Sequence, residues 1–408
     1  MPEHGVLPPN LDVPARDHHQ PLRRCAFANE KRATLELDRS QQQRNSCLVL
    51  RSELREQVRT AQDVERSLGC GPVCQVDCDR SYDDYPPRPS FDSAAYAHEF
   101  GRVCRVLAYL GLPTPLESLL YATDASLARQ AYSPRMMASF VNLAGFGFAA
   151  WDDATVHPEE PFVYRVTTLP THDQNLRALA HKLVPGCVLA HVRGVVEGAP
   201  VVVSQQNTHP FRFDDAHVAL AHNGHLREFA RMRFDLQKHV RPELARRVEG
   251  NTDSEWLYVL VLSQLRDPLG KPSVEELATA VVRTLEIVRD LRGRHGITTA
   301  SPVNLFVTTG VSLIVTRFSF DHGWYPPDDP LLELDLAYVT LWYTFGGEFK
   351  EHAGDWAMRG ADVASSLLVA SEPITSDTST WLEVPEYSLL AASRGDGTVV
   401  SELHDLEV

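Results

Sequence analysis

Among the residues of this 408-residue chain, one cysteine beside an apolar run is the clearest candidate for covalent catalysis. Cys104 precedes residues 106–111, whose mostly apolar side chains predict a buried β-strand. A thiolate attacks amide carbonyls, but an unperturbed thiol has a pKa of about 8.5 and needs a base at neutral pH. Cys104 is therefore either a nucleophile or an inert buried thiol, and its own surroundings leave both interpretations open.

An Asn-Gly pair, Asn223 and Gly224, carries the donors that attack on a carbonyl would need. The attack puts negative charge on the carbonyl oxygen, which preorganised N–H donors stabilise. Residues 218–221 predict a buried strand, and Asn-Gly just after its end predicts a turn that presents a side-chain NH2 and a backbone N–H together. An ordinary turn without a catalytic role is the alternative.

Two charged residues could hold the ends of a zwitterionic group. Arg193 ends the apolar run 188–192, a predicted strand, and a guanidinium at that position could bind a carboxylate through two hydrogen bonds. Asp253 lies in the polar run 251–255, before a predicted helix at residues 256–265, and its carboxylate could pair with an ammonium group. The alternatives are a solvated strand-end charge for Arg193 and a helix cap for Asp253.

These residues belong to motifs that follow one another in a fixed order. The motifs occupy residues 103–111, 190–193, 207–211, 221–224 and 250–255. Together they resemble the class II glutamine amidotransferases, a family of N-terminal-nucleophile hydrolases that cleave γ-glutamyl amides. The resemblance covers residues 104–408, about three quarters of the chain.

The resemblance implies a role for each of these residues. Cys104 would be the nucleophile, and its own α-amino group, with a reference pKa of roughly 7.7 to 8.0, would be the base. Asn223 and Gly224 would stabilise the oxyanion. The residues that would bind the glutamyl end of the substrate are Arg193, Asp253 and His209. No cofactor and no metal are expected.

The chain departs from the family pattern at two places. Ala144 stands where an acidic residue usually precedes the first glycine of a motif, and Val195 and Val196 follow Arg193 where relatives often have a small residue and a threonine. The second departure concerns fine recognition of the substrate carboxylate. Near the end, residues 371–373 and 381–385 resemble the C-terminal half of the family's standalone members.

The position of Cys104 conflicts with the implied mechanism, because an α-nitrogen in a peptide bond cannot act as a base. Residues 1–103 are therefore expected to be a disordered region, a cleaved pro-segment or the product of a mis-assigned start, with residues 104–408 as the amidotransferase-like domain. Only five of the 39 basic residues are lysine, a bias of GC-rich coding DNA, in which a GTG codon for Val103 could initiate translation. A protein that keeps Cys104 internal would be inactive.

The elements that must position these residues are strands and helices in an α+β order. Strands are expected at residues 106–111, 146–151, 188–193, 218–222, 304–308, 312–318, 334–345 and 366–370, and helices at 116–130, 254–265 and 274–292. This order predicts two stacked antiparallel sheets between helices, the four-layer αββα N-terminal-nucleophile hydrolase fold that the resemblance also implies.

Composition limits the class of partner. A net charge of -15 and a pI near 5.6 argue against binding to nucleic acid or to anionic membranes. No apolar run approaches the ~20 residues of a membrane span, and no signal peptide is evident, so a cytoplasmic location is expected. The odd number of seven cysteines argues against a disulfide framework, and Cys70, Cys74 and Cys78 lack the usual zinc spacing.

The function that these observations favour is hydrolysis of a small-molecule γ-glutamyl amide through a thioester on Cys104, with release of glutamate. Among the standalone relatives, the chain looks most like the ergothioneine-pathway amidohydrolase. The alternatives are a glutaminase subunit that supplies ammonia to a separate synthetase, and a noncatalytic binding protein in which Cys104 stays internal.

Overall fold

The structure, a computed structural model, describes residues 104–136, 144–194, 202–321, 340–352, 354–360 and 364–408. The chain divides into two units, Met1–Pro89 and Ser90–Val408, and every described residue belongs to the second. The predictions for residues 1–103, including the three clustered cysteines, lie outside the described residues. The same holds for Val195 and Val196 and for the first half of the strand expected at 334–345.

Within the described ranges, β1 (Arg105–Leu110) is the central strand of a seven-stranded antiparallel sheet with the order β13-β9-β12-β1-β4-β2-β3. The other strands are β2 (Phe146–Trp151), β3 (Phe162–Val166), β4 (Cys187–Val192), β9 (Trp342–Gly346), β12 (Ser366–Ala370) and β13 (Leu382–Glu383). Leu107 of β1 pairs with Ala370 on one side and with Ala190 on the other. The strand that follows Cys104 is therefore fixed from both sides.

A second antiparallel sheet has the order β15-β14-β7-β6-β5, with β8 paired to β6. Its strands are β5 (Ala219–Gly224), β6 (Ser301–Thr308), β7 (Ser312–Arg317), β8 (Ser319–Phe320), β14 (Ser388–Gly395) and β15 (Thr398–Asp405). A separate hairpin is formed by β10 (Glu348–His352) and β11 (Asp355–Arg359). The predicted hairpin around Gly310 is confirmed, and this glycine has a φ of +87°, which the turn requires.

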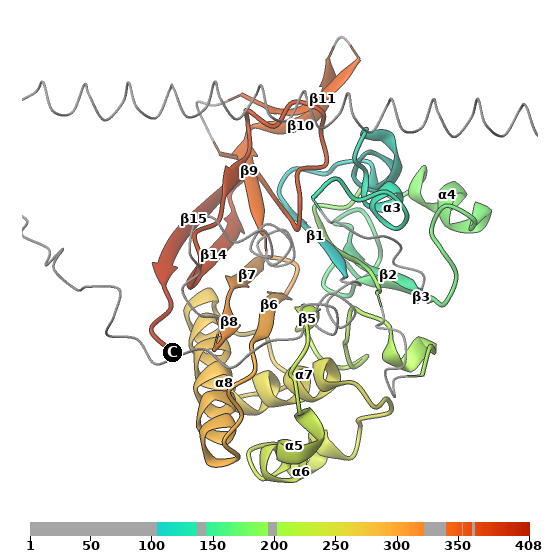
Figure 1. Ribbon diagram of the computed structural model, residues 1–408. Helices are drawn as coiled ribbons and strands as arrows, with labels where there is room; N and C mark the ends of the chain where they lie inside the picture. The colour runs from blue at the N-terminus through green and yellow to red at the C-terminus, as the bar shows by residue number, and fades with distance from the viewer. Residues whose placement is uncertain (1–103, 137–143, 195–201, 322–339, 353, 361–363) are drawn as a thin grey trace, which may run out of the picture. The chain divides into compact units, whose positions relative to one another are not determined.

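Helices cover the outer faces of both sheets (Figure 1). They are η2 (Ser118–Ala122), α3 (Leu127–Gln130), α4 (Gln174–Ala180), η3 (Gln205–Asn207), α5 (Phe229–Gln237), α6 (Pro242–Ala245), α7 (Asp253–Gln264) and α8 (Val274–Arg294). The prediction of α7 and α8 is confirmed to within two residues at each end. None of these helices combines the length and apolar character that crossing a bilayer requires.

The alternation of side chains along the strands builds the layers. Val106 and Ala108 of β1 belong to an apolar core that also contains Ala219 and Phe306 of the other sheet, so this core lies between the sheets. Leu107 points the opposite way, into a core shared with η2, α3 and α4. A third core joins the outer face of the second sheet to α5, α6, α7 and α8. The predicted four-layer αββα fold is confirmed.

One predicted helix is interrupted in the structure. Residues 116–130 were expected to form a single helix, but η2 ends at Ala122 and α3 begins only at Leu127. Thr123 between them is extended, with φ -82° and ψ 154°. Threonine and aspartate are weak helix formers, and Thr123-Asp124 gives the chain a place to leave the helix.

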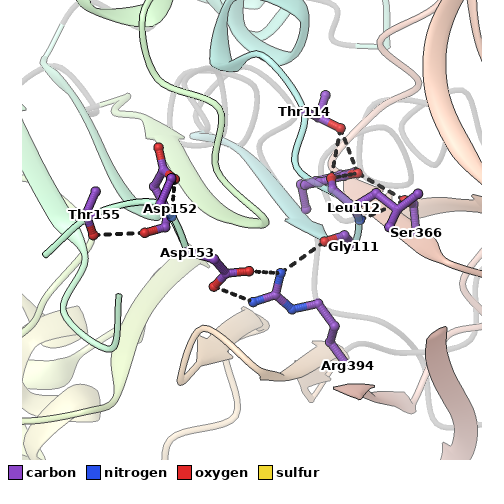
Figure 2. Close-up of polar contacts among 10 residues, drawn as sticks. Gly111, Leu112, Thr114, Asp152, Asp153, Thr155, Ser366 and Arg394 are labelled. Atoms are coloured by element: carbon purple, nitrogen blue, oxygen red, sulfur yellow. Dashed lines mark hydrogen bonds and ion pairs between the residues drawn. The ribbon is translucent and has the colours of Figure 1, made fainter. Parts of the chain in front are cut away.

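An arginine ties the two sheets together at the end of β1 remote from Cys104. Arg394 of β14 donates two hydrogen bonds to the carboxylate of Asp153, at 3.0 and 3.1 Å, and one to the carbonyl of Gly111, at 3.2 Å (Figure 2). Asp153 and Gly111 follow β2 and β1 of the other sheet. The guanidinium therefore spans the space between the sheets.

Candidate active site

The ends of four strands meet where the candidate residues lie. Because β1 runs antiparallel to β4 and β12, the start of β1 lies beside the ends of the other two. Cys104, Arg193 and Ser371 directly adjoin these three strand ends. A hydrogen bond from Asn223 to Ser371 brings the end of β5, in the second sheet, to the same place. Residues up to 267 positions apart in sequence thereby form one site.

The thiol of Cys104 is buried, with 9% of the residue exposed. The backbone N–H of Gly194 donates to Sγ at 3.4 Å, and Sγ lies 3.7 Å from the carbonyl oxygen of the same residue. Burial raises the pKa of this thiol, while the Gly194 N–H and the positive charge of Arg193 oppose the rise and the carboxylate of Asp253 adds to it. The sulfur is thus within electrostatic reach of both predicted charged residues.

Arg193 is nearly buried, with 3% of the residue exposed. Burial lowers the pKa of its guanidinium, and the negative charges of Cys104 and Asp253 counteract that effect. Its Nη1 donates one hydrogen bond, of 3.5 Å, to the carbonyl of Val202. Arg193 is therefore no solvated strand-end charge, and most of its five donors are not used by this contact.

Asp253 is the first residue of α7, and the predicted capping role falls to its neighbour. The hydroxyl of Thr252 caps the helix by accepting a hydrogen bond from the N–H of Glu255 at 3.2 Å. The carboxylate of Asp253 instead accepts from the N–H of Leu226 at 2.5 Å and from the N–H of Ser254 at 2.8 Å. These bonds fix the carboxylate at a helix N-terminus, where negative charge is stabilised.

The prediction of a turn at Asn223 and Gly224 is wrong. Both residues are the last of β5, and they pair with Asn304 and Val303 of β6. The strand continues because β6 extends to Ser301 and supplies partners beyond His222. Gly224 has a φ of +149°, and a Cβ atom there would lie 1.9 Å from the carbonyl oxygen of Pro302, so no larger residue fits.

Ser371 joins the two sheets at this site, a contact that the sequence reasoning missed. Its hydroxyl accepts a hydrogen bond of 3.0 Å from the N–H of Val106 and one of 3.1 Å from Nδ2 of Asn223. Ser371 is fully buried and Asn223 is 2% exposed. The only signal in the sequence was the resemblance of residues 371–373 to standalone family members.

Glu372, the next residue, forms a buried ion pair beside the cysteine. Its carboxylate lies 3.6 Å from Nη2 of Arg105, and both side chains are almost fully buried. Nη1 of Arg105 donates to the carbonyl oxygen of Cys104 at 3.4 Å. Residues 371 and 372 thus contact Val106 and Arg105, the first two residues of β1.

His209 lies in a group of buried aromatic rings. Its ring centre is 4.1 Å from that of His191 and 4.7 Å from that of Phe211. Burial holds the pKa of His209 well below its usual range, with the positive charge of Arg193 contributing, and lowers the pKa of His191 to about 3. Neither ring nitrogen of His209 has a hydrogen-bond partner among the described residues. The imidazole is therefore neutral at pH 7.

Asn207 links the segments that carry Arg193 and Asp253, and sequence reasoning assigned it no role. Its Nδ2 donates to the carbonyl of Val202 at 2.7 Å, the same oxygen that Arg193 contacts, and to Oδ1 of Asn251 at 2.8 Å. Its Oδ1 accepts from the N–H of Asn251 at 3.0 Å. One hydrogen-bonded frame thus joins Arg193 to Asn251, two residues before Asp253.

The arrangement suits hydrolysis of an amide that carries both charges of an amino acid. A thiol lies at the start of β1, the side-chain NH2 of Asn223 is linked to that strand through the hydroxyl of Ser371, and the charges of Arg193 and Asp253 both affect the pKa of the thiol. Within the described ranges, no group of three or more histidine, cysteine or acidic side chains could hold a metal ion.

Comparisons with known proteins agree with these motifs. The family model for class II glutamine amidotransferases matches residues 120–329. The chain is 29% identical over 311 residues to the "Probable glutamine amidotransferase DUG3" of Saccharomyces cerevisiae, an alignment that covers 72% of this chain and 82% of that protein. It is 28% identical over 253 residues to the gamma-glutamyl-hercynylcysteine sulfoxide hydrolase of Mycobacterium tuberculosis, covering 59% of this chain and 96% of that one.

A solved structure, that of a glutamine aminotransferase class-II domain protein from Silicibacter pomeroyi, is 23% identical with a TM-score of 0.46. The match covers 74% of this chain and 100% of that one.

Proposed function

The chain belongs to the class II glutamine amidotransferases, and on that premise we propose that it hydrolyses a γ-glutamyl amide with Cys104 as the nucleophile. The observation that carries the proposal is that the buried thiol of Cys104 accepts a hydrogen bond of 3.4 Å from the backbone N–H of Gly194, the residue after Arg193, while the charges of Arg193 and Asp253 both affect its pKa. A γ-glutamyl group has an α-carboxylate and an α-ammonium, and these two residues have the complementary charges. His209, a neutral ring whose pKa the charge of Arg193 helps to lower, is the third residue proposed for the glutamyl end.

The reaction proceeds in two steps. The thiol proton of Cys104 passes to the α-amino group of the same residue while sulfur bonds to the γ-carbonyl carbon. The amide C–N bond breaks, the α-ammonium group gives its proton to the leaving amine, and a thioester remains. Water then gives a proton to the α-amino group of Cys104 while its oxygen bonds to the thioester carbon. The C–S bond breaks, that proton passes to the sulfur, and glutamate is released with the thiol restored. In both steps the side-chain NH2 of Asn223 and the backbone N–H of Gly224 stabilise the oxyanion.

The α-amino group is the proposed base because burial raises the pKa of the Cys104 thiol, which therefore needs a base close to the sulfur. The hydrogen-bond partners of Sγ are both atoms of Gly194, so no histidine of the described residues contacts it. The active form must then begin at Cys104. Either a segment ahead of it is removed, or translation starts at Val103 and the initiating methionine is cleaved.

The substrate we favour is a γ-glutamyl derivative of a thiol compound. A relative with 28% identity is named for hydrolysis of gamma-glutamyl-hercynylcysteine sulfoxide. A relative with 29% identity is named only as a probable glutamine amidotransferase, which favours glutamine itself as the second candidate, with ammonia passed to a separate synthetase. Comparing kcat/KM for γ-glutamylcysteine and for glutamine separates the two substrates.

The test of the mechanism uses two versions of the protein. One starts at Met1 and is protected from processing, and the other starts with methionine directly before Cys104. We expect glutamate release only from the second, with N-terminal sequencing that reads cysteine first. Equal activity from an uncleaved chain would mean that another group is the base, and the N-terminal-nucleophile mechanism would be wrong.

A further inference from the structure

We propose that Ser371 positions the side chain of Asn223 for oxyanion stabilisation and ties it to the strand that carries Cys104. The inference rests on the proposed function, since it assigns a partner to the oxyanion donor named there. Ser371 itself contacts no reacting atom. It acts through Asn223 and Val106, and it is therefore a positioning residue.

The hydrogen bonds of Ser371 replace part of the ladder between β1 and β12. The backbone N–H of Ser371 donates to the carbonyl of Val106 at 3.0 Å, as in a regular antiparallel pair. The N–H of Val106 does not return to the carbonyl of Ser371 but donates to its hydroxyl at 3.0 Å. That carbonyl instead accepts from the hydroxyl of Thr340 at 3.0 Å. The serine side chain is thus the acceptor for the backbone two residues after Cys104.

The same hydroxyl reaches across to the second sheet. Nδ2 of Asn223 donates to Oγ at 3.1 Å, and this is the hydrogen bond that its side-chain amide makes among the described residues. Oγ therefore accepts from one donor of each sheet. Because all these groups are buried, their relative positions are restricted by packing as well as by hydrogen bonding.

This geometry determines where the amide of Asn223 points. One N–H of Nδ2 is directed at Ser371, which fixes the plane of the amide and leaves the second N–H for the substrate oxygen. Without the serine hydroxyl, rotation of the amide would be less restricted, and the donor would have to be reoriented during the reaction. Preorganised donors contribute more because they avoid this reorganisation.

Ser366 provides a matched control. It lies at the other end of β12, is also fully buried, and its hydroxyl likewise accepts from a backbone N–H beyond β1, that of Leu112, at 3.2 Å (Figure 2). It is remote from Cys104. Ser366→Ala therefore measures what loss of a buried β12 hydroxyl does to the fold alone.

The experiment measures kcat and KM for γ-glutamylcysteine and for glutamine in the protein that begins at Cys104. We expect Ser371→Ala to lower kcat roughly tenfold to a hundredfold, less than the ~10²- to 10³-fold loss typical of deleting an oxyanion donor, with KM nearly unchanged. Ser371→Thr, which keeps the hydroxyl, should recover most of the rate, and Ser366→Ala should leave kcat unchanged. The double variant Ser371→Ala with Asn223→Ala should be no slower than Asn223→Ala alone.

Three results would overturn the proposal: independent, multiplicative losses in the double variant, a change in KM alone, or equal kcat losses in Ser371→Ala and Ser366→Ala. An inactive parent protein would contradict the proposed function itself, and the oxyanion role with it. The side-chain NH2 signals of Asn223 in NMR spectra, identified by their loss in Asn223→Ala, do not depend on activity. They should shift in Ser371→Ala and not in Ser366→Ala, and unchanged signals would show that Ser371 does not hold the amide.

Discussion

Replacing Arg193 with alanine removes a guanidinium that is 3% exposed and acts electrostatically on both Cys104 and Asp253. Its hydrogen bond to the chain, to Val202 at 3.5 Å, is long. The substitution therefore removes little stabilisation from the free protein, and we expect the free energy of unfolding to fall by no more than about 1 kcal/mol. We expect the main loss in the complex with the carboxylate of the proposed γ-glutamyl substrate.

The size of that loss follows from the burial of the guanidinium. Removing one partner of a desolvated, hydrogen-bonded charge pair costs ~2 to 5 kcal/mol, and about 1.4 kcal/mol corresponds to a factor of ten. We therefore expect kcat/KM to fall by roughly thirtyfold or more. Arg193→Lys keeps the charge but not the paired donors, and its kcat/KM should lie between the values of the wild type and of Arg193→Ala.

The assay compares kcat/KM for glutamine and for γ-glutamylcysteine and records a thermal melting curve for each variant. Arg283→Ala is the control. Arg283 is exposed on α8, where it pairs with Glu286 at 2.9 Å. Helix α8 packs on the outer face of the second sheet, whereas Cys104 precedes a strand of the first sheet. The loss should be the same for both substrates, since both present the same glutamyl end. A loss for only one leaving group would place Arg193 in a different subsite, and no loss would refute its role.

Three further outcomes test other parts of the site and fold. Cys104→Ala should abolish glutamate release with an unchanged circular dichroism spectrum, and any retained turnover would exclude the thioester. Asp253→Asn should lower the pKa of the Cys104 thiol, because the carboxylate raises it, whereas Arg193→Ala should raise that pKa. The midpoint of the pH profile of alkylation by iodoacetamide should thus shift to lower pH in Asp253→Asn and to higher pH in Arg193→Ala. Shifts of the same sign would contradict the electrostatic assignment. Arg394→Ala should reduce the free energy of unfolding, measured in urea titrations, by only about 1 to 2 kcal/mol, because its partner Asp153 is half exposed. We expect kcat/KM to stay unchanged. A fall in kcat/KM would show that the end of β1 remote from Cys104 affects the site.

Much of the fold could be predicted because local patterns carry it. The strands at Phe146–Trp151 and Ser366–Ala370 consist mostly of apolar residues, and both were expected at these residues. Helix α8 has an acidic first turn and a basic last turn, which mark its ends in the sequence. Such signals depend only on neighbouring residues, so no tertiary information was needed.

The parts that could not be predicted depend on pairing between distant segments. Asn223 and Gly224 look like a turn until β6 supplies Asn304 and Val303 as partners. Ser371 contacts Val106 across 265 positions, and nothing near either residue indicates the register that joins them. The closeness of Cys104, Arg193 and Asp253 was expected from the order of their motifs, while the frame around Asn207 was not.

The central place of β1 in its sheet has a consequence for how the protein is made. The first described strand is completed by β12, whose residues leave the ribosome about 260 positions after those of β1. Pairing between segments so far apart forms slowly, and it cannot begin before the later segment has been synthesised. A nascent or truncated chain that ends before Ser366 has a cysteine but neither the strand nor the serine beside it. If the proposed function is correct, a chain that ends before Ser366 therefore lacks hydrolytic capacity.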